Sequence, residues 1–170
     1  MEYPKPNMRQ LIDWRAALLA GICSGLISQL SNILLSWWLL DSPWIITRIV
    51  ASLALGEQVL PPPDQFEWGI LLAGLAVHLS LSILFACVVA IVVHRWGILV
   101  SFVGGALLGL AFYAINFYTM SYFFPWFYAF RSWIFIIAHI LYGALAGSIY
   151  ELLEVEVYVP VEDEKRRKDE

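Results

Sequence analysis

The sequence predicts an all-α integral membrane protein with four transmembrane helices, and three observations lead to this prediction. Of the 170 residues, 61% are hydrophobic and only 14% are charged, whereas soluble domains average about 45 to 50% and about 25%. The mean hydropathy is +0.74. A hydrocarbon core about 30 Å thick needs about 20 helical residues, and four apolar stretches have that length: 16–40, 69–93, 97–120 and 133–153.

The first stretch could also be a secretory signal, because Arg9 and Arg15 precede it. Its apolar run of about 25 residues is longer than the hydrophobic region of such signals, and no cleavage site of small residues follows. We therefore interpret it as an uncleaved membrane anchor, so that residues 1–153 form a single membrane domain.

The segment between the first two stretches predicts a short helix over residues 43–56. Asp41 is a capping residue, Pro43 suits a first helical turn, and Gly56 suits a helix end. The apolar residues of this segment share one face, and its polar residues share another. We expect this helix to lie along the outer membrane interface rather than to span the bilayer. The polar face carries Thr47, Arg48 and Ser52.

The distribution of Lys and Arg predicts the orientation, because cytoplasmic loops are enriched in both. In the four-span arrangement eight of these residues lie on one side and two on the other. Both termini are then cytoplasmic in a bacterial inner (plasma) membrane, with residues 154–170 forming a charged, weakly ordered tail. The eight are Lys5, Arg9, Arg15, Arg95, Lys165, Arg166, Arg167 and Lys168, and the two are Arg48 and Arg131.

The two halves of the sequence resemble each other, which indicates a tandem duplication of a two-helix hairpin. An offset of 84 residues aligns the first stretch with the third, and an offset of 61 aligns the second with the fourth. Halves with an even number of spans run parallel and relate by a pseudo-two-fold axis along the membrane normal. Chance matching of apolar helices is the alternative explanation. The aligned small residues predict close helix packing: Gly21, Gly25, Ser82, Ala86, Gly105, Gly109, Gly143 and Gly147.

The same alignment matches Asn32 with Asn116 and His78 with His139, all about 9 to 14 Å from the outer ends of their helices. Polar side chains at this depth should point inward, because facing lipid is costly. One interpretation is structural, with each Asn bonded to the His of its own hairpin. A second is that His78 and His139 bind one haem b. A third is a small-ligand or proton pathway through this layer.

Other classes of function find little support in the sequence. The net charge of −4 leaves no basic face for nucleic acid. The two cysteines, Cys23 and Cys87, form neither a disulfide framework nor a metal motif, and no catalytic motif is present. Aromatic residues cluster at the outer boundary, where they form either an interfacial belt or a docking surface for a partner.

The closing stretch Ala138-His139-Ile-Leu-Tyr-Gly143-Ala-Leu-Ala-Gly147, with a glycine-rich first helix and a Pro-Trp segment after it, resembles small bacterial inner-membrane proteins of the YagU-like type. This resemblance implies a four-helix membrane protein and transfers no catalytic residue. We expect a non-catalytic membrane subunit, without a cofactor, that packs among lipids in a larger complex, respiratory or photosynthetic, or self-associates. A protein binding haem b or transporting a small ligand through the His78 and His139 layer is the alternative.

Overall fold

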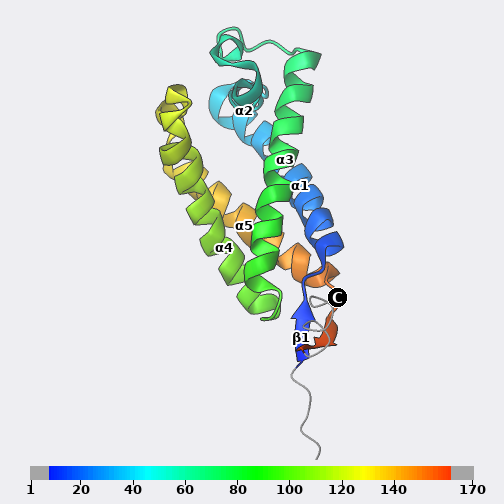
Figure 1. Cartoon of the computed structure of the whole chain (residues 1–170). Helices are drawn as coiled ribbons and strands as arrows, with labels where there is room; N and C mark the ends of the chain where they lie inside the picture. The colour runs from blue at the N-terminus through cyan, green and yellow to red at the C-terminus, as the bar shows by residue number, and fades with distance from the viewer. Residues whose placement is uncertain (1–7, 162–170) are drawn as a thin grey trace, which may run out of the picture.

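The computed structural model describes residues 8–161, and its main elements are four long apolar helices arranged in an elongated bundle (Figure 1). They are α1 (Trp14–Leu40), α3 (Trp68–Val93), α4 (Ile98–Ala114) and α5 (Trp133–Leu153). A π-helical turn (Ile115–Thr119) and a 3-10 turn (Met120–Tyr122) prolong α4. With that extension, all four are long and apolar enough to cross a membrane. The predicted multi-pass membrane architecture is thus confirmed in the number and position of its helices.

The ends of the helices follow from local sequence. Asp13 caps α1, because its carboxylate accepts hydrogen bonds from the amides of Arg15 and Ala16 at 2.9 and 3.0 Å. Ser132 caps α5 by accepting a bond from the amide of Phe135. Gly97, with φ of +74°, makes the left-handed turn that separates α3 from α4.

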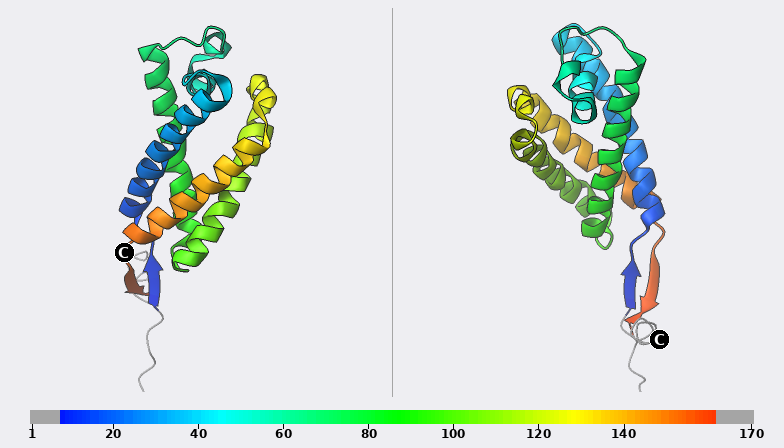
Figure 2. Two further views of the ribbon diagram at one scale, coloured as in Figure 1. Left: turned by 180° about the vertical axis from the view of Figure 1, so that it is seen from behind. Right: turned by 45° about the horizontal axis from the view of Figure 1, so that its top comes forward.

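The long helices pack as two pairs. α1 packs along α3 and α4 packs along α5, while α1 and α3 also contact α5. Seen from the side, the pairs are close together near the chain ends and diverge toward the opposite end (Figures 1 and 2). The closely packed end holds the larger apolar core, which is rich in alanine. Its fully buried members are Ala17, Ala20, Ala86, Val89, Ala90, Ala146 and Tyr150.

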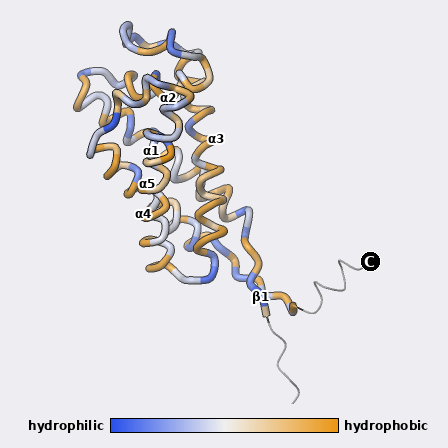
Figure 3. Tube along the Cα trace, turned by 60° about the vertical axis from the view of Figure 1, so that its left-hand side comes forward, coloured by the Kyte–Doolittle hydropathy of each residue, from blue (hydrophilic) through white to orange (hydrophobic). Residues whose placement is uncertain are grey.

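Apolar side chains also face outward along the whole bundle. Figure 3 shows hydrophobic residues running along the helices and hydrophilic ones gathered at turns and ends. Leu84, Leu99 and Leu107 are 64 to 73% exposed. An outer surface of this kind is matched to lipid rather than to water.

At the diverging end, α2 (Ile45–Leu55) packs on α3 and, less extensively, on α1. It occupies the place predicted for a helix over 43–56, but its polar face is buried instead of facing water. Thr47 accepts a bond from Gln29 at 3.1 Å. Arg48, only 3% exposed, pairs with Glu67 at 2.7 Å. Sequence reasoning missed this burial because the partners lie in other segments, on α1 and on the connector to α3.

Two short strands form at the closely packed end: β1 (Met8–Leu11) and β2 (Val157–Pro160) pair antiparallel. The expectation that the chain after Glu154 is weakly ordered is therefore wrong for β2. Its β-branched residues Val157 and Val159 favour a strand, and β1 offers the ladder partner. Gln10 also donates to the Glu154 carboxylate at 3.2 Å. The predicted tail beyond residue 161 lies outside the described residues.

Candidate functional site

A cavity of about 470 Å³ lies between the two helix pairs at their diverging end. Residues from α1, α2, α3, α5 and the segment 112–130 line it. This volume is within the range of about 300 to 1,000 Å³ found for small-molecule sites. Its apolar wall includes Ile49, Leu53, Leu81, Phe112, Phe117, Met120, Phe124, Phe127, Phe130 and Phe135.

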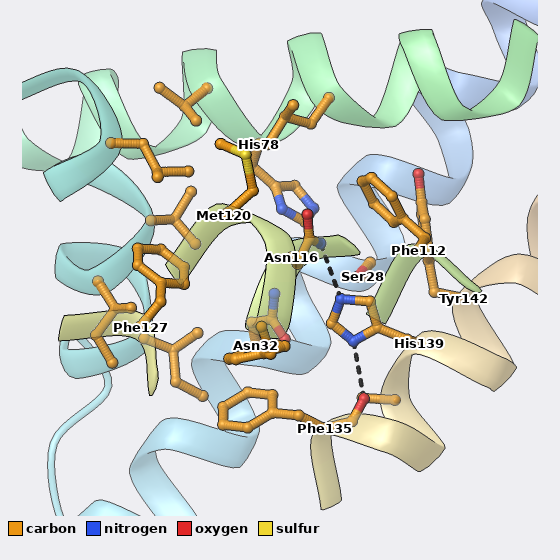
Figure 4. A pocket seen from close by; sticks show the side chains of 18 of the residues that line it. Ser28, Asn32, His78, Phe112, Asn116, Met120, Phe127, Phe135, His139 and Tyr142 are labelled. Atoms are coloured by element: carbon orange, nitrogen blue, oxygen red, sulfur yellow. Dashed lines mark hydrogen bonds between the residues drawn. The ribbon is translucent and has the colours of Figure 1, made fainter. Parts of the chain in front are cut away.

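The four polar residues predicted to form one layer all line this cavity. Asn32 comes from α1, His78 from α3, Asn116 from the π-helical turn and His139 from α5. Figure 4 shows them around a common space, with Asn116 between the two imidazoles. The packing of the four long helices therefore brings together side chains that are up to 107 residues apart in the sequence.

His139 is held through both ring nitrogens (Figure 4). Nδ1 lies 2.8 Å from the carbonyl oxygen of Phe135, and Nε2 lies 3.2 Å from Nδ2 of Asn116. A carbonyl only accepts, so Nδ1 carries the proton, and the lone pair of Nε2 accepts from the Asn116 amide. The bond between Asn116 and His139 is the one that the structural interpretation predicted for this hairpin.

The first hairpin is arranged differently. His78 donates through Nε2 to the carbonyl oxygen of Gly25 at 3.0 Å, and no hydrogen bond joins it to Asn32. Asn32 forms no hydrogen bond with any described residue, although it lines the cavity. The predicted Asn-to-His bond is therefore present in one half and absent from the other.

The π-helical turn (Ile115–Thr119) positions Asn116. A π-helical turn inserts an extra residue and changes the direction of the side chains that follow, and such turns occur frequently at functional sites. Here the turn carries Asn116 and Phe117, which both line the cavity. No sequence signal identified this turn, because its residues resemble those of an ordinary apolar helix.

The predicted small residues allow the two helices of each pair to approach each other closely. A Cβ atom on Gly25 would lie 2.9 Å from Cβ of Ser82, and one on Gly21 would lie 2.6 Å from Cα of Ile83. In the second pair, Cβ atoms on Gly105 and Gly143 would overlap each other's carbonyl oxygens. Gly109 faces the carbonyl of His139, Gly147 faces that of Ser101, and Ala86 is fully buried in the alanine-rich core.

α2 and a 3-10 turn (Pro125–Phe130) cover the cavity at the diverging end, and we call these two segments the roof. Nε1 of Trp126 donates to Oγ of Ser52 at 2.8 Å, and this bond joins the two segments. Ile49, Phe117 and Phe127 form a second apolar cluster beneath it. The aromatic residues of this region, predicted to lie at the membrane boundary, also form walls of the cavity.

The lining determines which chemistry the cavity suits. None of its residues is Asp, Glu, Lys or Arg, so the cavity offers no countercharge to an ion. Within residues 8–161, no group of three His, Cys, Asp or Glu side chains could hold a metal ion. Haem ligation through His139 would need the Nε2 lone pair that Asn116 now occupies. His78 and His139 thus line the same cavity, while both ring nitrogens of His139 are held by hydrogen bonds within the protein.

No family model, no curated protein and no solved structure matches this sequence. The resemblance to YagU-like proteins stays a prediction.

Proposed function

We propose that this chain is a non-catalytic multi-pass membrane protein that binds a small apolar molecule in the cavity between its two helix pairs. The observation that supports this most directly is the cavity itself, about 470 Å³ in volume and lined by side chains from both halves of the chain. Its aromatic and aliphatic walls with a few converging polar groups are typical of ligand sites. A bundle built only for packing would fill such a space with side chains.

The proposed orientation places the strand end of the bundle in the cytoplasm of a bacterial cell, with the chain in the inner membrane and the cavity in the outer half. Arg9 and Arg15 lie beside the strand end, and Arg95 lies in the turn between α3 and α4. Arg48 and Arg131 lie at the opposite end, where Arg48 is buried. This asymmetry supports cytoplasmic termini. The same orientation places α2 beside the outer end of α3, which supports an interfacial location for this helix.

The proposed tandem repeat gains support from matched contacts. Gly25 approaches Ser82 in the first pair, and Gly109 approaches Gly143 in the second. These are corresponding positions at the offsets of 84 and 61 residues. A duplicated hairpin accounts for a ligand site between the halves, because binding sites of repeat-built membrane proteins lie at the repeat interface.

A second candidate function is that of a subunit in a larger membrane complex, respiratory or photosynthetic, or in a self-assembled oligomer. Large aromatic side chains at the outer end favour it, because such residues are enriched where proteins bury one another. Trp38 is 80% exposed and Tyr122 is 85% exposed. Lipid would also cover these residues, so the cavity supports ligand binding more specifically than the surface supports a partner.

Ligand binding can be tested with a photoactivatable apolar probe, azidoanthracene, on the full chain in lipid nanodiscs. Labelled residues are mapped by mass spectrometry in the wild type and in Ala138→Phe, which fills part of the cavity. We expect labelling of the cavity walls to fall at least about tenfold in this variant. Ile137→Phe is the matched control, because Ile137 directly precedes Ala138 in α5 and is 46% exposed.

Three other results would contradict the proposal. The first is labelling confined to the outer surface, and the second is wall labelling equal in both variants. The third is a Soret band in protein purified from its native membrane, which would support the haem b alternative instead. A fixed set of co-purifying proteins together with unlabelled walls would support the subunit function.

A further inference from the structure

The polar groups in the cavity are unequally satisfied, and the difference follows the two halves of the chain. In the second half, Asn116 and His139 bond each other, and Nδ1 of His139 bonds a backbone carbonyl. In the first half, Asn32 has no hydrogen-bond partner among the described residues, and Nδ1 of His78 has none either. Asn32 and Asn116 correspond at the offset of 84 residues, so one member of this pair is satisfied and the other is free.

The hydroxyl of Ser28 also lacks a hydrogen-bond partner among the described residues. Serine hydroxyls inside apolar helices usually bond a carbonyl of the preceding turn. Of the four serines in α1, Ser24 and Ser31 do so, at 2.6 and 2.9 Å, and Ser36 bonds the carbonyl of Ser42. Ser28 alone forms no hydrogen bond with a described residue, and it lines the cavity one turn before Asn32.

Free polar groups within a membrane-spanning helix are costly, because the hydrocarbon offers them no partner. Two neighbouring groups without a partner, both facing one cavity, indicate that a bound molecule supplies the partner. In the second half, Phe112 occupies the position that corresponds to Ser28, and Phe117 and Phe135 also line the cavity. The unpartnered polar side chains of the lining therefore come from α1, and most of its aromatic side chains come from the second half of the chain.

We infer that the cavity binds a neutral lipid-soluble molecule with a carbonyl or hydroxyl head, and that Ser28 and Asn32 bind that head while the phenylalanine wall covers its apolar body. The head is uncharged, because no lining residue carries a charge that could compensate an ion. The Asn32 amide and the Ser28 hydroxyl can each donate to and accept from an oxygen. Nδ1 of His78, whose lone pair is free when Nε2 donates to Gly25, offers a further acceptor. This inference rests on the proposed ligand-binding function and specifies the class of ligand.

The test uses competition against azidoanthracene labelling of the full chain in nanodiscs, with four compounds that share a twelve-carbon chain. They are dodecane, 2-dodecanone, 1-dodecanol and dodecanoate. The concentration of each is expressed as its mole fraction in the bilayer. We expect the ketone and the alcohol to displace the label at about tenfold lower concentration than dodecane, the factor that one or two net hydrogen bonds supply. The ratio between the ketone and the alcohol shows which of these two heads the cavity prefers.

Variants separate the head-binding residues from the rest of the cavity. Asn32→Leu and Ser28→Ala should each reduce the advantage of the ketone and the alcohol over dodecane several-fold. Ser31→Ala is the control on the same helix, since Ser31 is exposed and bonds only its own backbone, and it should keep the full advantage. Both test variants replace a free polar group by an apolar one in an apolar helix, so their folding is retained.

The outcomes distinguish this inference from the proposed function. If dodecane competes as well as the ketone, or if the advantage survives both variants, the head-group inference is wrong while ligand binding stands. Strongest competition by dodecanoate would also overturn it, because the head would then be charged. If the probe does not label the cavity walls of the wild type, the proposed function fails, and the inference fails with it.

Discussion

Trp126 and Ser52 are 74 residues apart in the sequence, and the 2.8 Å bond from Nε1 of Trp126 to Oγ of Ser52 connects the two helix pairs over the cavity. Ser52 is fully buried, and its own hydroxyl donates to the carbonyl of Ile49 at 2.6 Å. The bond therefore joins α2 to the 3-10 turn (Pro125–Phe130), alongside the apolar contacts of Ile49 with Phe117 and Phe127.

Replacing Trp126 with Phe should lower the free energy of unfolding by about 1 kcal/mol, the net value of one hydrogen bond. It should also increase access of azidoanthracene to the cavity, because the roof segments are no longer bonded. Thermal unfolding in detergent and the rate of labelling measure the two effects. Trp133→Phe is the control, since Trp133 is 69% exposed. Equal effects of both variants would show that the bond does not hold the roof.

Gly109→Ala should destabilise the second helix pair. The added methyl group would overlap the carbonyl oxygen of His139 and would lie 3.1 Å from Cα of Gly143. Overpacking of this kind costs about 1 to 3 kcal/mol, whereas alanine gains up to about 1 kcal/mol in helix propensity. Unfolding in a titration with dodecyl sulfate measures the net loss. Gly69→Ala, where a methyl group would meet nothing within 4 Å, should be neutral or stabilising.

Asn116→Leu should cost more stability than Asn32→Leu. The first change removes the hydrogen bond to His139, worth about 0.6 to 2 kcal/mol in a membrane. The second removes no hydrogen bond within the described residues. The same dodecyl sulfate titration compares the two variants. A larger loss in Asn32→Leu would mean that Asn32 has a structural partner and is not available to a ligand.

Arg48→Met should loosen the connector between α2 and α3. The buried guanidinium donates to the carbonyls of Val59 and Gln65 and to the carboxylate of Glu67. Hydrogen bonds involving a charged group contribute about 1.5 to 3 kcal/mol each, so the loss should reach at least about 1.5 kcal/mol. Limited proteolysis within residues 57–67 reports the loosening.

Glu67→Gln is the matched change for Arg48→Met. Glu67 is 55% exposed, and the backbone carbonyls still accept from Arg48. This variant should remain within about 1 kcal/mol of the wild type. Equal cleavage of the two variants would show that the ion pair, and not the carbonyl bonds, holds the connector.

Asp13 makes the start of α1 sensitive to acid. The hydrogen bond from the Ala16 amide is the main cause that lowers the pKa of Asp13 below its usual value. The capping contribution, about 0.5 to 2 kcal/mol, is therefore present above the unfolded pKa of about 3.9. It is lost as the pH falls through the lower pKa of the folded state.

Unfolding measured between pH 7 and pH 2 tests this dependence. Asp13→Ala should be less stable than the wild type at pH 7, and the difference should shrink toward pH 2. Asp13→Asn keeps a capping oxygen without a charge and should show little change with pH. An undiminished difference between wild type and Asp13→Ala at pH 2 would contradict a role for the charge.

Sequence reasoning predicted the parts of this structure that depend on local composition and periodicity. The four long helices follow from apolar length, and the last was predicted at its observed bounds, Trp133–Leu153. The shared location of Asn32, His78, Asn116 and His139 followed from their equal depth in neighbouring helices. Features that depend on distant partners were not predicted. The burial of Arg48 depends on Glu67, and the strand Val157–Pro160 depends on Met8–Leu11.

The cavity was also beyond sequence reasoning, for a related reason. Phe117, Phe127 and Phe135 could face lipid, a partner protein or one another, and composition does not distinguish these environments. Their orientation depends on the π-helical turn at Ile115–Thr119 and on the angle at which the helix pairs diverge. Both properties arise from packing across the whole chain.

The pairing of β1 with β2 also determines how the cavity can change in size. The strand ladder and the alanine-rich core fasten α1, α3 and α5 at one end. At the other end, the Trp126 to Ser52 bond and the apolar cluster of Ile49, Phe117 and Phe127 connect the two pairs. A rotation of one helix pair against the other would therefore pivot at the strand end. The displacement grows with distance from the pivot, so a small change of angle there alters the cavity most. The proposed ligand site lies at the end of the bundle farthest from the strand ladder.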